Sequence, residues 1–416
     1  MRIAVVGMGY VGLPLAVAFA DAGAEVVCLD SDEKKVAALA AGSSYIEDIP
    51  SAELARVGTR LHPTGEYAEL AGCEAIVICV PTPLTPEREP DLSFLLAAGE
   101  AVGAVLAAGQ LVVLESTTYP GTTREELAPL LERSGLRAGE DFALAFSPER
   151  IDPGRTDYTV RSTPKLVGGL TATCTERAQA LYGLICDEVV PLSSPEAAEM
   201  SKLLENVFRS VNIAFVNELA QLCDRLGIDV WEVVGAAATK PFGFMRFDPG
   251  PGMGGHCLPV DPFYLAHKAR EVEFEPAFIE LAGKVNQAQP AYCVNRIERA
   301  LLEHDGELGG ARVLILGVSY KGGVGDTRES PALRIIDLLN KRDAKVSYHD
   351  PHVPELPAQG LRSVELSPAL GAAEIVVLVT RHPEFDLAEL VADSRLLLDL
   401  RGATRELEPA ANVILL

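Results

Sequence analysis

Short runs of hydrophobic residues alternate with longer segments of helical spacing through the first half of the chain. Strands that alternate with helices form parallel sheets, so this pattern predicts a doubly wound α/β domain. Ligands of such a domain bind beyond the carboxyl ends of the strands. The predicted strands are residues 3–6, 25–29, 75–80, 111–115, 142–146 and 165–167.

The pattern changes at Pro195. From there to Leu226 the chain runs for 32 residues without a further proline or glycine, and apolar residues recur at helical spacing. One helix of this length spans about 48 Å at 1.5 Å per residue, which is enough to join two domains. Shorter helices are predicted at residues 229–237 and 276–289.

Strand and helix alternate again toward the C-terminus. We therefore expect two Rossmann-like doubly wound parallel-sheet domains, joined by a long central helix and a helical middle domain. The predicted C-terminal strands are residues 312–317, 345–348, 375–380 and 396–400, with a helix that starts at Pro331. The expected domain boundaries are residues 1–193, 194–300 and 301–416.

The first predicted strand leads into the sequence GMGYVG at residues 7–12, followed by a helix and by a strand that ends at Asp30. This is the dinucleotide-binding fingerprint in its usual strand–turn–helix context. Gly7 would form the tight turn, Gly9 would let a pyrophosphate approach, and Gly12 would allow close packing of helix on strand. A carboxylate at Asp30 would bond the ribose hydroxyls and repel a 2′-phosphate, which favours NAD over NADP.

A loop rich in glycine and proline surrounds a cysteine at residues 249–262, with the sequence PGPGMGGHCLPVDP. Its glycines let the backbone approach a ligand closely, and its prolines stiffen it. Asp261 follows Cys257 by four residues, so a thiol and a carboxylate could share one pocket. This arrangement suits nucleophilic catalysis, and the alternative is a turn around a buried, inert cysteine.

Two pairs of charged or polar residues have open interpretations. Lys202 and Asn206 lie four residues apart and share one helix face, where the lysine could be a solvated edge residue or could stabilise an oxyanion. Lys321 and Arg328 provide cations suited to phosphates, and exposed loop charges are the alternative.

The cysteine and histidine patterns favour neither disulfides nor a metal. The eight cysteines include no C-x-x-C pair and no zinc signature, which is typical of reduced thiols. His349 and His352 flank Asp350 in a proline-rich turn. Because no further ligands accompany them, we expect a solvated loop there and no metal site.

Charge and size restrict the function classes. The 416 residues include 36 Lys and Arg against 59 Asp and Glu, a net charge of −23. Such an acidic chain repels nucleic acid and anionic membranes, so neither is an expected partner. No apolar run reaches transmembrane length, and the apolar stretch after Arg2 lacks a signal-peptide cleavage site. We therefore expect a cytoplasmic protein.

Six motifs in order resemble those of the UDP-glucose/GDP-mannose dehydrogenase family over nearly the full chain. They are GMGYVGLPLA, ESTTYPGTT, FSPERIDPG, EMSKLLENVFRSVNIAFVNE, PGPGMGGHCLPVDPFYL and GVSYKGGVGDTRESPA. The branch that acts on UDP-N-acetylhexosamines is the most similar. The resemblance implies an NAD-binding N-terminal domain, a helical dimerising middle and a C-terminal domain that binds the UDP-sugar, in a homodimer or larger homo-oligomer.

The resemblance also implies a chemistry: the two-step, four-electron oxidation of a sugar C6 alcohol to a uronic acid. Cys257 would form a thiohemiacetal and then a thioester that water cleaves. Lys202 and Asn206 would stabilise the oxyanions, and Asp261 would hold or deprotonate water.

Further residues acquire roles from the same resemblance. Glu149 would assist acid–base steps and thioester hydrolysis, and Thr117 would orient water near the nicotinamide. The implied cofactor-binding residues are Gly7, Gly9, Tyr10, Val11, Gly12, Asp30, Lys35, Thr82, Thr117 and Arg328. The implied substrate-binding residues are Glu149, Arg150, Lys202, Asn206, Gly252, Gly254 and Lys321.

The expected substrate is UDP-N-acetylglucosamine or UDP-N-acetylmannosamine. UDP-glucose dehydrogenases usually carry a lysine where this chain has Val260 and an arginine where it has Pro241. UDP-glucose or GDP-mannose is the alternative substrate. Two other classes share the glycine fingerprint: a single-step dehydrogenase of a small hydroxy acid, which gives Cys257 no role, and an NAD-sensing regulatory protein.

Overall fold

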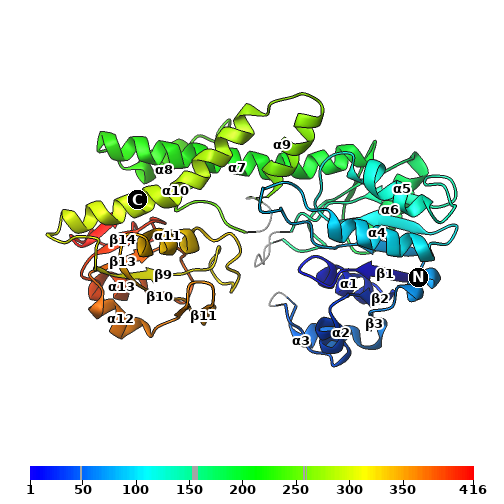
Figure 1. The fold of residues 1–416 in the computed structure, drawn as a ribbon, viewed down its shortest axis with the longest axis horizontal. Helices are drawn as coiled ribbons and strands as arrows, with labels where there is room; N and C mark the ends of the chain where they lie inside the picture. The colour runs from blue at the N-terminus through cyan, green and yellow to red at the C-terminus, as the bar shows by residue number, and fades with distance from the viewer. Residues whose placement is uncertain (47–48, 152–157, 256–257, 259) are drawn as a thin grey trace. The chain divides into compact units, whose positions relative to one another are not determined.

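A computed structural model describes residues 1–46, 49–151, 158–255, 258 and 260–416 (Figure 1). The chain forms two compact units. Unit 1 comprises residues 1–205 and 263–274, and unit 2 comprises residues 206–262 and 275–416.

Unit 1 is built on an eight-stranded sheet in the order β3-β2-β1-β4-β5-β6-β7-β8. The first six positions have the strand order of dinucleotide-binding doubly wound sheets, whose ligands bind where the order reverses, between β1 and β4. The strands are β1 Arg2–Val6, β2 Glu25–Leu29, β3 Leu61–Thr64, β4 Ala75–Ile78, β5 Leu111–Leu114, β6 Ala143–Phe146, β7 Lys165–Gly169 and β8 Val189–Leu192.

The α/β prediction for this domain is confirmed, with two differences. β6 and β7 pair antiparallel, because the described part of their connection contains no helix to carry the chain back across the sheet. The two edge strands, β3 and β8, were not predicted from the sequence. Each contains a proline, Pro63 or Pro191, and proline is tolerated in edge strands but weakens a strand signal.

Helices cover both faces of this sheet, because successive strand residues point to opposite faces. One core joins alternate strand residues such as Val5 and Val77 to α1, α3 and α6. The other joins their neighbours, such as Val6 and Ile78, to α4, α5 and the start of α7. The helices are α1 Gly12–Asp21, α2 Glu33–Ala40, α3 Ser51–Val57, α4 Ser93–Val105, α5 Ala128–Glu132 and α6 Ala172–Tyr182.

Unit 2 contains a second doubly wound sheet, in the order β10-β9-β13-β14-β15, with every pair parallel. Helix α11 covers one face and α12 and α13 the other, as Figure 1 shows. The strands are β9 Arg312–Leu316, β10 Lys345–His349, β13 Ile375–Leu378, β14 Leu397–Asp399 and β15 Val413–Leu415, with a separate hairpin of β11 Glu355–Leu356 and β12 Leu361–Arg362. The helices are α11 Pro331–Asn340, α12 Leu366–Ala372 and α13 Leu387–Asp393.

The long helix is confirmed as α7 Pro195–Leu226, and α8 Val230–Ala238 follows it. Helix α9 Asp261–Glu271 was not predicted from the sequence, and the prediction that the next helix ends at residue 289 was wrong. α10 Ala277–Leu302 continues through Pro290. An interior proline costs a helix about 3 kcal/mol, but the second half of α10 buries an apolar face against the C-terminal sheet, which outweighs that cost.

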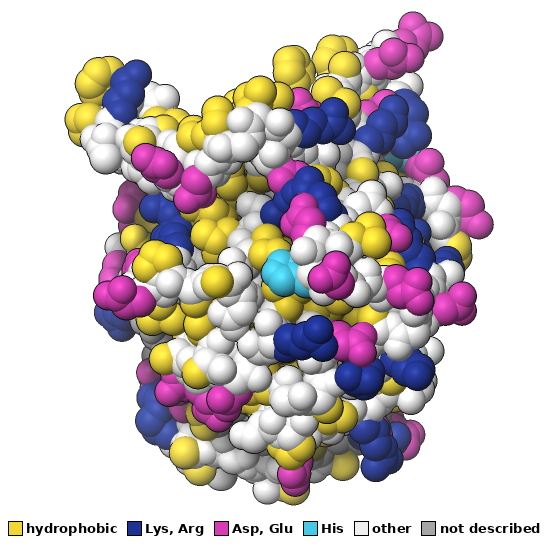
Figure 2. Space-filling view, turned by 90° about the vertical axis from the view of Figure 1, so that its left-hand side faces the viewer, with side chains coloured by type: hydrophobic (Ala, Val, Ile, Leu, Met, Phe, Trp, Pro, Cys, Tyr) yellow, Lys and Arg dark blue, Asp and Glu magenta, His cyan; other side chains and the backbone are white. Residues whose placement is uncertain are grey.

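Exposed hydrophobic side chains of unit 2 concentrate on α7 and α10. Phe215 and Leu222 on α7 are 66% and 51% exposed, and Phe278 and Leu281 on α10 are 80% and 56% exposed. Figure 2 shows several hydrophobic side chains along the upper edge of its face, interspersed with charged ones. In the part of the chain that the structure describes, no helix is both long and apolar enough to cross a bilayer.

Candidate active site

The turn after β1 has the geometry of a phosphate-binding loop. Gly7 has a φ of +96°, a conformation that favours glycine. A Cβ on Gly12 would lie 1.8 Å from the carbonyl oxygen of Gly7, so only glycine lets α1 pack this closely. A Cβ on Gly9 would meet no heavy atom within 4 Å. The turn therefore leaves room beside the N-terminus of α1, which suits the pyrophosphate of a dinucleotide.

Asp30, directly after β2, joins that strand to the glycine turn. Its Oδ2 accepts hydrogen bonds from the Met8 N–H at 2.8 Å and from Lys35 Nζ at 3.0 Å. Its Oδ1 accepts one from the Asp32 N–H at 2.9 Å and keeps a second acceptor position for a ribose hydroxyl. Tyr45 donates to the Met8 carbonyl at 2.8 Å, a contact that no sequence pattern indicated.

The other residues predicted to bind the cofactor in unit 1 follow β1, β4 and β5. Tyr10 is 43% exposed, and Val11 packs partly buried against the core. The Thr82 hydroxyl donates to the Thr117 carbonyl at 2.7 Å, which joins the segments after β4 and β5. Tyr264 of α9 donates to the Thr82 carbonyl at 3.0 Å, so α9 supports this segment.

Glu149, three residues after β6, is held by backbone and side-chain groups. Its Oε1 accepts the N–H groups of Arg150 at 2.7 Å and Ile151 at 2.5 Å, and its Oε2 lies 3.4 Å from Lys165 Nζ. Burial raises the pKa of Glu149, but the charge of Lys165, the two N–H groups and the charge of Lys202 together hold it below the ordinary value. The carboxyl group is therefore ionised at neutral pH.

Lys165, at the start of β7, is buried between two carboxylates. Its Nζ pairs with Glu115, directly after β5, and lies 5.1 Å from the centre of the Tyr182 ring. The Tyr182 hydroxyl donates to Glu115 at 2.5 Å. Burial raises the pKa of Glu115 even beside Lys165. None of these three residues was predicted as part of the site, although a lysine at the start of an apolar strand was an available signal in the sequence.

Lys202 and Arg150 are both anchored within unit 1. Lys202 is 8% exposed, and its Nζ donates to the Glu149 carbonyl at 2.6 Å, so it is not a solvated edge residue. Arg150 donates to the Pro164 carbonyl at 2.6 Å and pairs with Glu205 at 2.7 Å. Lys202 therefore contacts the chain segment that follows β6, and Arg150 belongs to that segment.

Asn206 and Asp261 meet in unit 2. Asn206 Nδ2 donates to Asp261 Oδ2, and the two residues are 6% and 1% exposed. Cys257, the predicted nucleophile, lies outside the described residues. The seven cysteines that the structure describes are all free thiols and buried, as expected for reduced core residues.

Two polar side chains hold the described part of the glycine loop. Asn217 Oδ1 on α7 accepts the Gly250 N–H at 2.9 Å, and Gln289 Nε2 on α10 donates to the Gly250 carbonyl at 2.9 Å. Gly252 has a φ of +133°. A Cβ on Gly254 would lie 2.7 Å from the Tyr320 Cβ, so close packing within unit 2 is one reason for glycine there.

Lys321 and Arg328 lie between β9 and α11. Lys321 is partly exposed, and its carbonyl accepts the Ser319 hydroxyl at 2.7 Å. Arg328 is exposed and pairs with Asp326 at 2.7 Å. Both side chains keep contact with solvent, so the structure leaves their two interpretations open.

The histidines near β10 are more engaged than a solvated loop requires. One ligand atom each of His352, His382 and Glu384 lie within 4.8 Å of one another. However, His382 Nδ1 accepts the Gly323 N–H at 3.2 Å, and its Nε2 faces Asp350 at 3.0 Å. Because both ring nitrogens are hydrogen-bonded, His382 has no lone pair to offer an ion.

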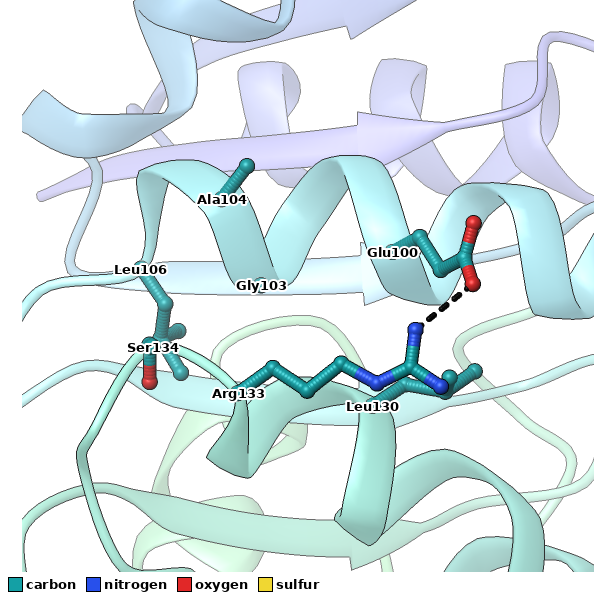
Figure 3. Close-up of a pocket in the computed structure, with 7 residues that line it drawn as sticks. All are labelled: Glu100, Gly103, Ala104, Leu106, Leu130, Arg133 and Ser134. Carbon is teal, nitrogen blue, oxygen red and sulfur yellow. Dashed lines mark hydrogen bonds and ion pairs between the residues drawn. The ribbon is translucent and has the colours of Figure 1, made fainter.

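A surface pocket in unit 1 lies between α4 and α5 (Figure 3). The ion pair of Glu100 and Arg133, at 2.7 Å, spans it. Its residues lie toward the C-terminal ends of α4 and α5, and these helices lead into the amino ends of β5 and β6. Doubly wound sheets bind their ligands at the opposite edge, beyond the carboxyl ends of the strands. The pocket is therefore separate from the candidate site. Its lining consists of Glu100, Gly103, Ala104, Leu106, Leu130, Arg133 and Ser134.

The strand order of unit 1 and its glycine turn define a Rossmann dinucleotide-binding protein. Three successive parts of the chain match the three domains of one protein family. Residues 1–185 match the NAD binding domain of the UDP-glucose/GDP-mannose dehydrogenase family, residues 196–288 its central domain and residues 314–406 its UDP binding domain. The chain belongs to this family and is an NAD-dependent nucleotide-sugar dehydrogenase, as its motifs predicted.

Individual relatives are similar over almost the whole chain. UDP-N-acetyl-D-glucosamine 6-dehydrogenase of Pseudomonas aeruginosa is 38% identical, covering 92% of this chain and 91% of the relative. UDP-N-acetyl-D-mannosamine dehydrogenase of Pyrococcus horikoshii is 37% identical, covering 92% and 90%. A solved structure of the UDP-D-ManNAc dehydrogenase from Pyrococcus horikoshii superposes with a TM-score of 0.90 at 35% identity, covering 100% of this chain and 98% of that one.

Proposed function

We propose that the protein is a UDP-N-acetylhexosamine 6-dehydrogenase that converts UDP-N-acetylglucosamine or UDP-N-acetylmannosamine to the uronic acid. The names of the two relatives support these substrates. Val260 and Pro241, which replace the lysine and arginine usual in UDP-glucose dehydrogenases, also favour them over UDP-glucose. UDP-glucose or GDP-mannose is the second candidate.

The proposed reaction consumes one primary alcohol, two NAD⁺ and one water, and it yields one carboxylic acid, two NADH and two protons. When bound, NAD⁺ accepts one hydride in each oxidation. The open space at Gly9 and the acceptor capacity of Asp30 fit this cofactor. The proposed contacts are Gly7, Gly9, Tyr10, Val11, Gly12, Asp30, Lys35, Thr82, Thr117 and Arg328, of which Arg328 would exchange its partner Asp326 for the cofactor.

The pairing of Asn206 with Asp261 is the observation that carries the catalytic part of the proposal. It joins the Asn206 amide to the carboxylate of Asp261, which follows Cys257 by four residues in the sequence. The Cys257 thiolate would attack the C6 aldehyde, and Asn206 and Lys202 would stabilise the oxyanion of the thiohemiacetal. Asp261 would then orient or deprotonate the water that cleaves the thioester.

Glu149 and Thr117 complete the proposed chemistry from unit 1. Because Glu149 is held ionised, it would act as a base toward the alcohol or the hydrolytic water. Thr117 would orient water near the nicotinamide. The proposed sugar-nucleotide contacts are Glu149, Arg150, Lys202, Asn206, Gly252, Gly254 and Lys321.

We also propose domain boundaries, a state of assembly and a cellular location. Residues 1–193 would form the NAD domain, residues 194–300 the central domain and residues 301–416 the domain that binds the UDP-sugar. The exposed hydrophobic residues on α7 and α10 favour a homodimer or a larger homo-oligomer. The acidic net charge of −23 favours a cytoplasmic location and argues against nucleic-acid partners.

The stoichiometry of NADH tests the proposed function. A limiting amount of each UDP-N-acetylhexosamine, UDP-glucose and GDP-mannose is incubated with excess NAD⁺, and NADH is measured by absorbance. We expect two NADH per UDP-N-acetylhexosamine, whereas one would indicate a single oxidation and none would contradict the proposal. Cys257→Ser is expected to bind NAD⁺ normally and to lose kcat with little change in KM, because serine is a poorer nucleophile and leaving group.

A further inference from the structure

We propose that Lys165 is a positioning residue that keeps the Glu149 carboxylate ionised, so that Glu149 serves the reaction as a base. This inference rests on the catalytic role proposed above for Glu149. Lys165 itself is buried at the start of β7, and it would act on the reaction only through Glu149.

Different groups fix the direction of the Glu149 carboxylate and supply the positive charge beside it. Backbone N–H groups of Arg150 and Ile151 fix its Oε1, which sets the direction of the carboxylate. Oε2 faces Lys165 Nζ at 3.4 Å, so this lysine supplies the positive charge on that side. Lys202 instead donates to the backbone carbonyl of Glu149, and its charge lowers the pKa of the carboxyl group less than that of Lys165.

A buried lysine tends to lose its proton, and the neighbours of Lys165 prevent this. Burial lowers the pKa of Lys165, but Glu115 and Glu149 raise it well above its ordinary value. Tyr182 donates to Glu115 and fixes that carboxylate against the lysine. The titratable groups that act on Glu149 from neighbouring elements are Cys79, Glu115, Lys165, Cys186 and Lys202, and Tyr182 and Glu205 act on its neighbours Glu115 and Arg150.

The charges around Glu149 determine in which direction its pKa changes when Lys165 is removed. Burial raises the pKa of Glu149, and Lys165, Lys202 and two N–H groups lower it. If Lys165 were removed, only Lys202 and the N–H groups would oppose burial, so the pKa of Glu149 would rise. A base is active when deprotonated, so the acidic limb of the kcat profile would move to higher pH. A lysine that only filled space would leave that limb in place.

Two variants that differ at Lys165 alone test the inference. Glu115→Gln keeps the lysine beside Glu149, and Glu115→Gln/Lys165→Met removes it without leaving Glu115 as an uncompensated buried charge. We expect the acidic limb of the double variant to lie at least about one pH unit above that of Glu115→Gln, with sugar KM within about twofold. Lys165→Arg should keep the wild-type limb, because it keeps the charge. Equal limbs in the two Glu115→Gln backgrounds, together with equal protonation of Glu149 in the two proteins, would overturn the inference.

An infrared titration of the Glu149 carboxyl group, taken as the difference between each protein and its Glu149→Gln counterpart, gives a readout besides activity. In the wild type we expect protonation below the ordinary glutamate range, and a value at or above that range overturns the inference even if no Lys165 variant folds. A shifted titration with an unmoved kcat profile would leave Lys165 as the residue that ionises Glu149, but would remove Glu149 from the proposed mechanism. The two failures are therefore distinguishable.

Discussion

Two glutamates of unit 1, the partly buried Glu149 and the buried Glu199, differ in charge state because their partners differ. Glu149 faces a lysine and backbone N–H groups, and its pKa is lowered. Glu199 on α7 is fully buried and accepts the Gly121 N–H at 2.6 Å and the Thr123 N–H and hydroxyl at 2.9 and 2.7 Å. Burial outweighs these bonds and raises the pKa of Glu199 to about 7. Glu199 therefore titrates near neutral pH.

Glu199 should make the stability of unit 1 depend on pH. Its folded pKa of about 7 exceeds the ordinary 4.5, so its contribution is fully present below pH 4.5 and is lost as the pH rises through 7. The loss is up to about 3 kcal/mol at 1.36 kcal/mol per unit. We expect the wild-type Tm to fall between pH 5 and 8, and the fall to be smaller in Glu199→Gln, as measured by scanning calorimetry.

Glu196→Gln is the matched control, because Glu196 lies on the same helix but its pKa is lowered: burial raises it, and hydrogen bonds from Arg124, the backbone and Ser194 together outweigh burial. This control should retain the wild-type fall in Tm. An equally steep fall in Glu199→Gln would show that other groups cause the pH dependence.

At the scale of elements, the turn from β1 to α1 combines packing and ligand binding in different glycines. Gly12 sets the distance between helix and strand, because the Gly7 carbonyl occupies the space where a Cβ would stand. Gly9 has open space instead. The fingerprint is thus one sequence motif with two separable physical requirements.

Alanine substitutions should separate these requirements. Gly12→Ala is expected to destabilise unit 1 by about 1–3 kcal/mol through overpacking, and to weaken NAD binding as well. Gly9→Ala should leave Tm within about a degree of wild type and raise the Kd for NAD⁺ at least about tenfold, because its methyl group would enter the space proposed for the pyrophosphate. Calorimetry of both variants checks this, and equal losses of Tm would refute the separation.

At the scale of the whole molecule, exposed apolar residues follow one stripe of α7. Phe208, Phe215 and Leu222 recur every seven residues and are 44–66% exposed. Phe278 and Leu281 on α10 are also exposed. Hydrophobic stripes of this kind mark protein contacts, and a second copy of the chain is the proposed partner.

A charge in this stripe should separate the subunits. Phe215→Glu/Leu222→Glu is expected to convert a homodimer to monomers at micromolar concentration, because the carboxylates would be buried in the contact. Light scattering measures the mass. Glu406→Lys, a substitution at an exposed position of unit 2 outside α7 and α10, should leave the mass unchanged. A monomeric wild type would contradict the proposed assembly.

The fold followed from the sequence wherever a strand was buried on both faces or a helix had clear ends. β2 and α7 have the predicted bounds, because an apolar run between polar residues and a long stretch free of proline and glycine are unambiguous signals. β3 and β8 each contain a proline, and α10 contains Pro290, so local sequence patterns argued against strands and a continuous helix at these positions. Burial against distant segments decided those elements, and distant contacts are absent from local sequence patterns.

The sequence alone determined the chemistry of the cofactor turn and the family, because glycine spacing and short motifs act through the local backbone. It also placed Lys202, Asn206 and Asp261 among the candidates. Only the tertiary structure brought Lys165 and Glu115, 50 residues apart, into one buried pair beside Glu149. A charge inside a sheet is stable only with partners from other strands, and the chain order does not reveal which strands become neighbours.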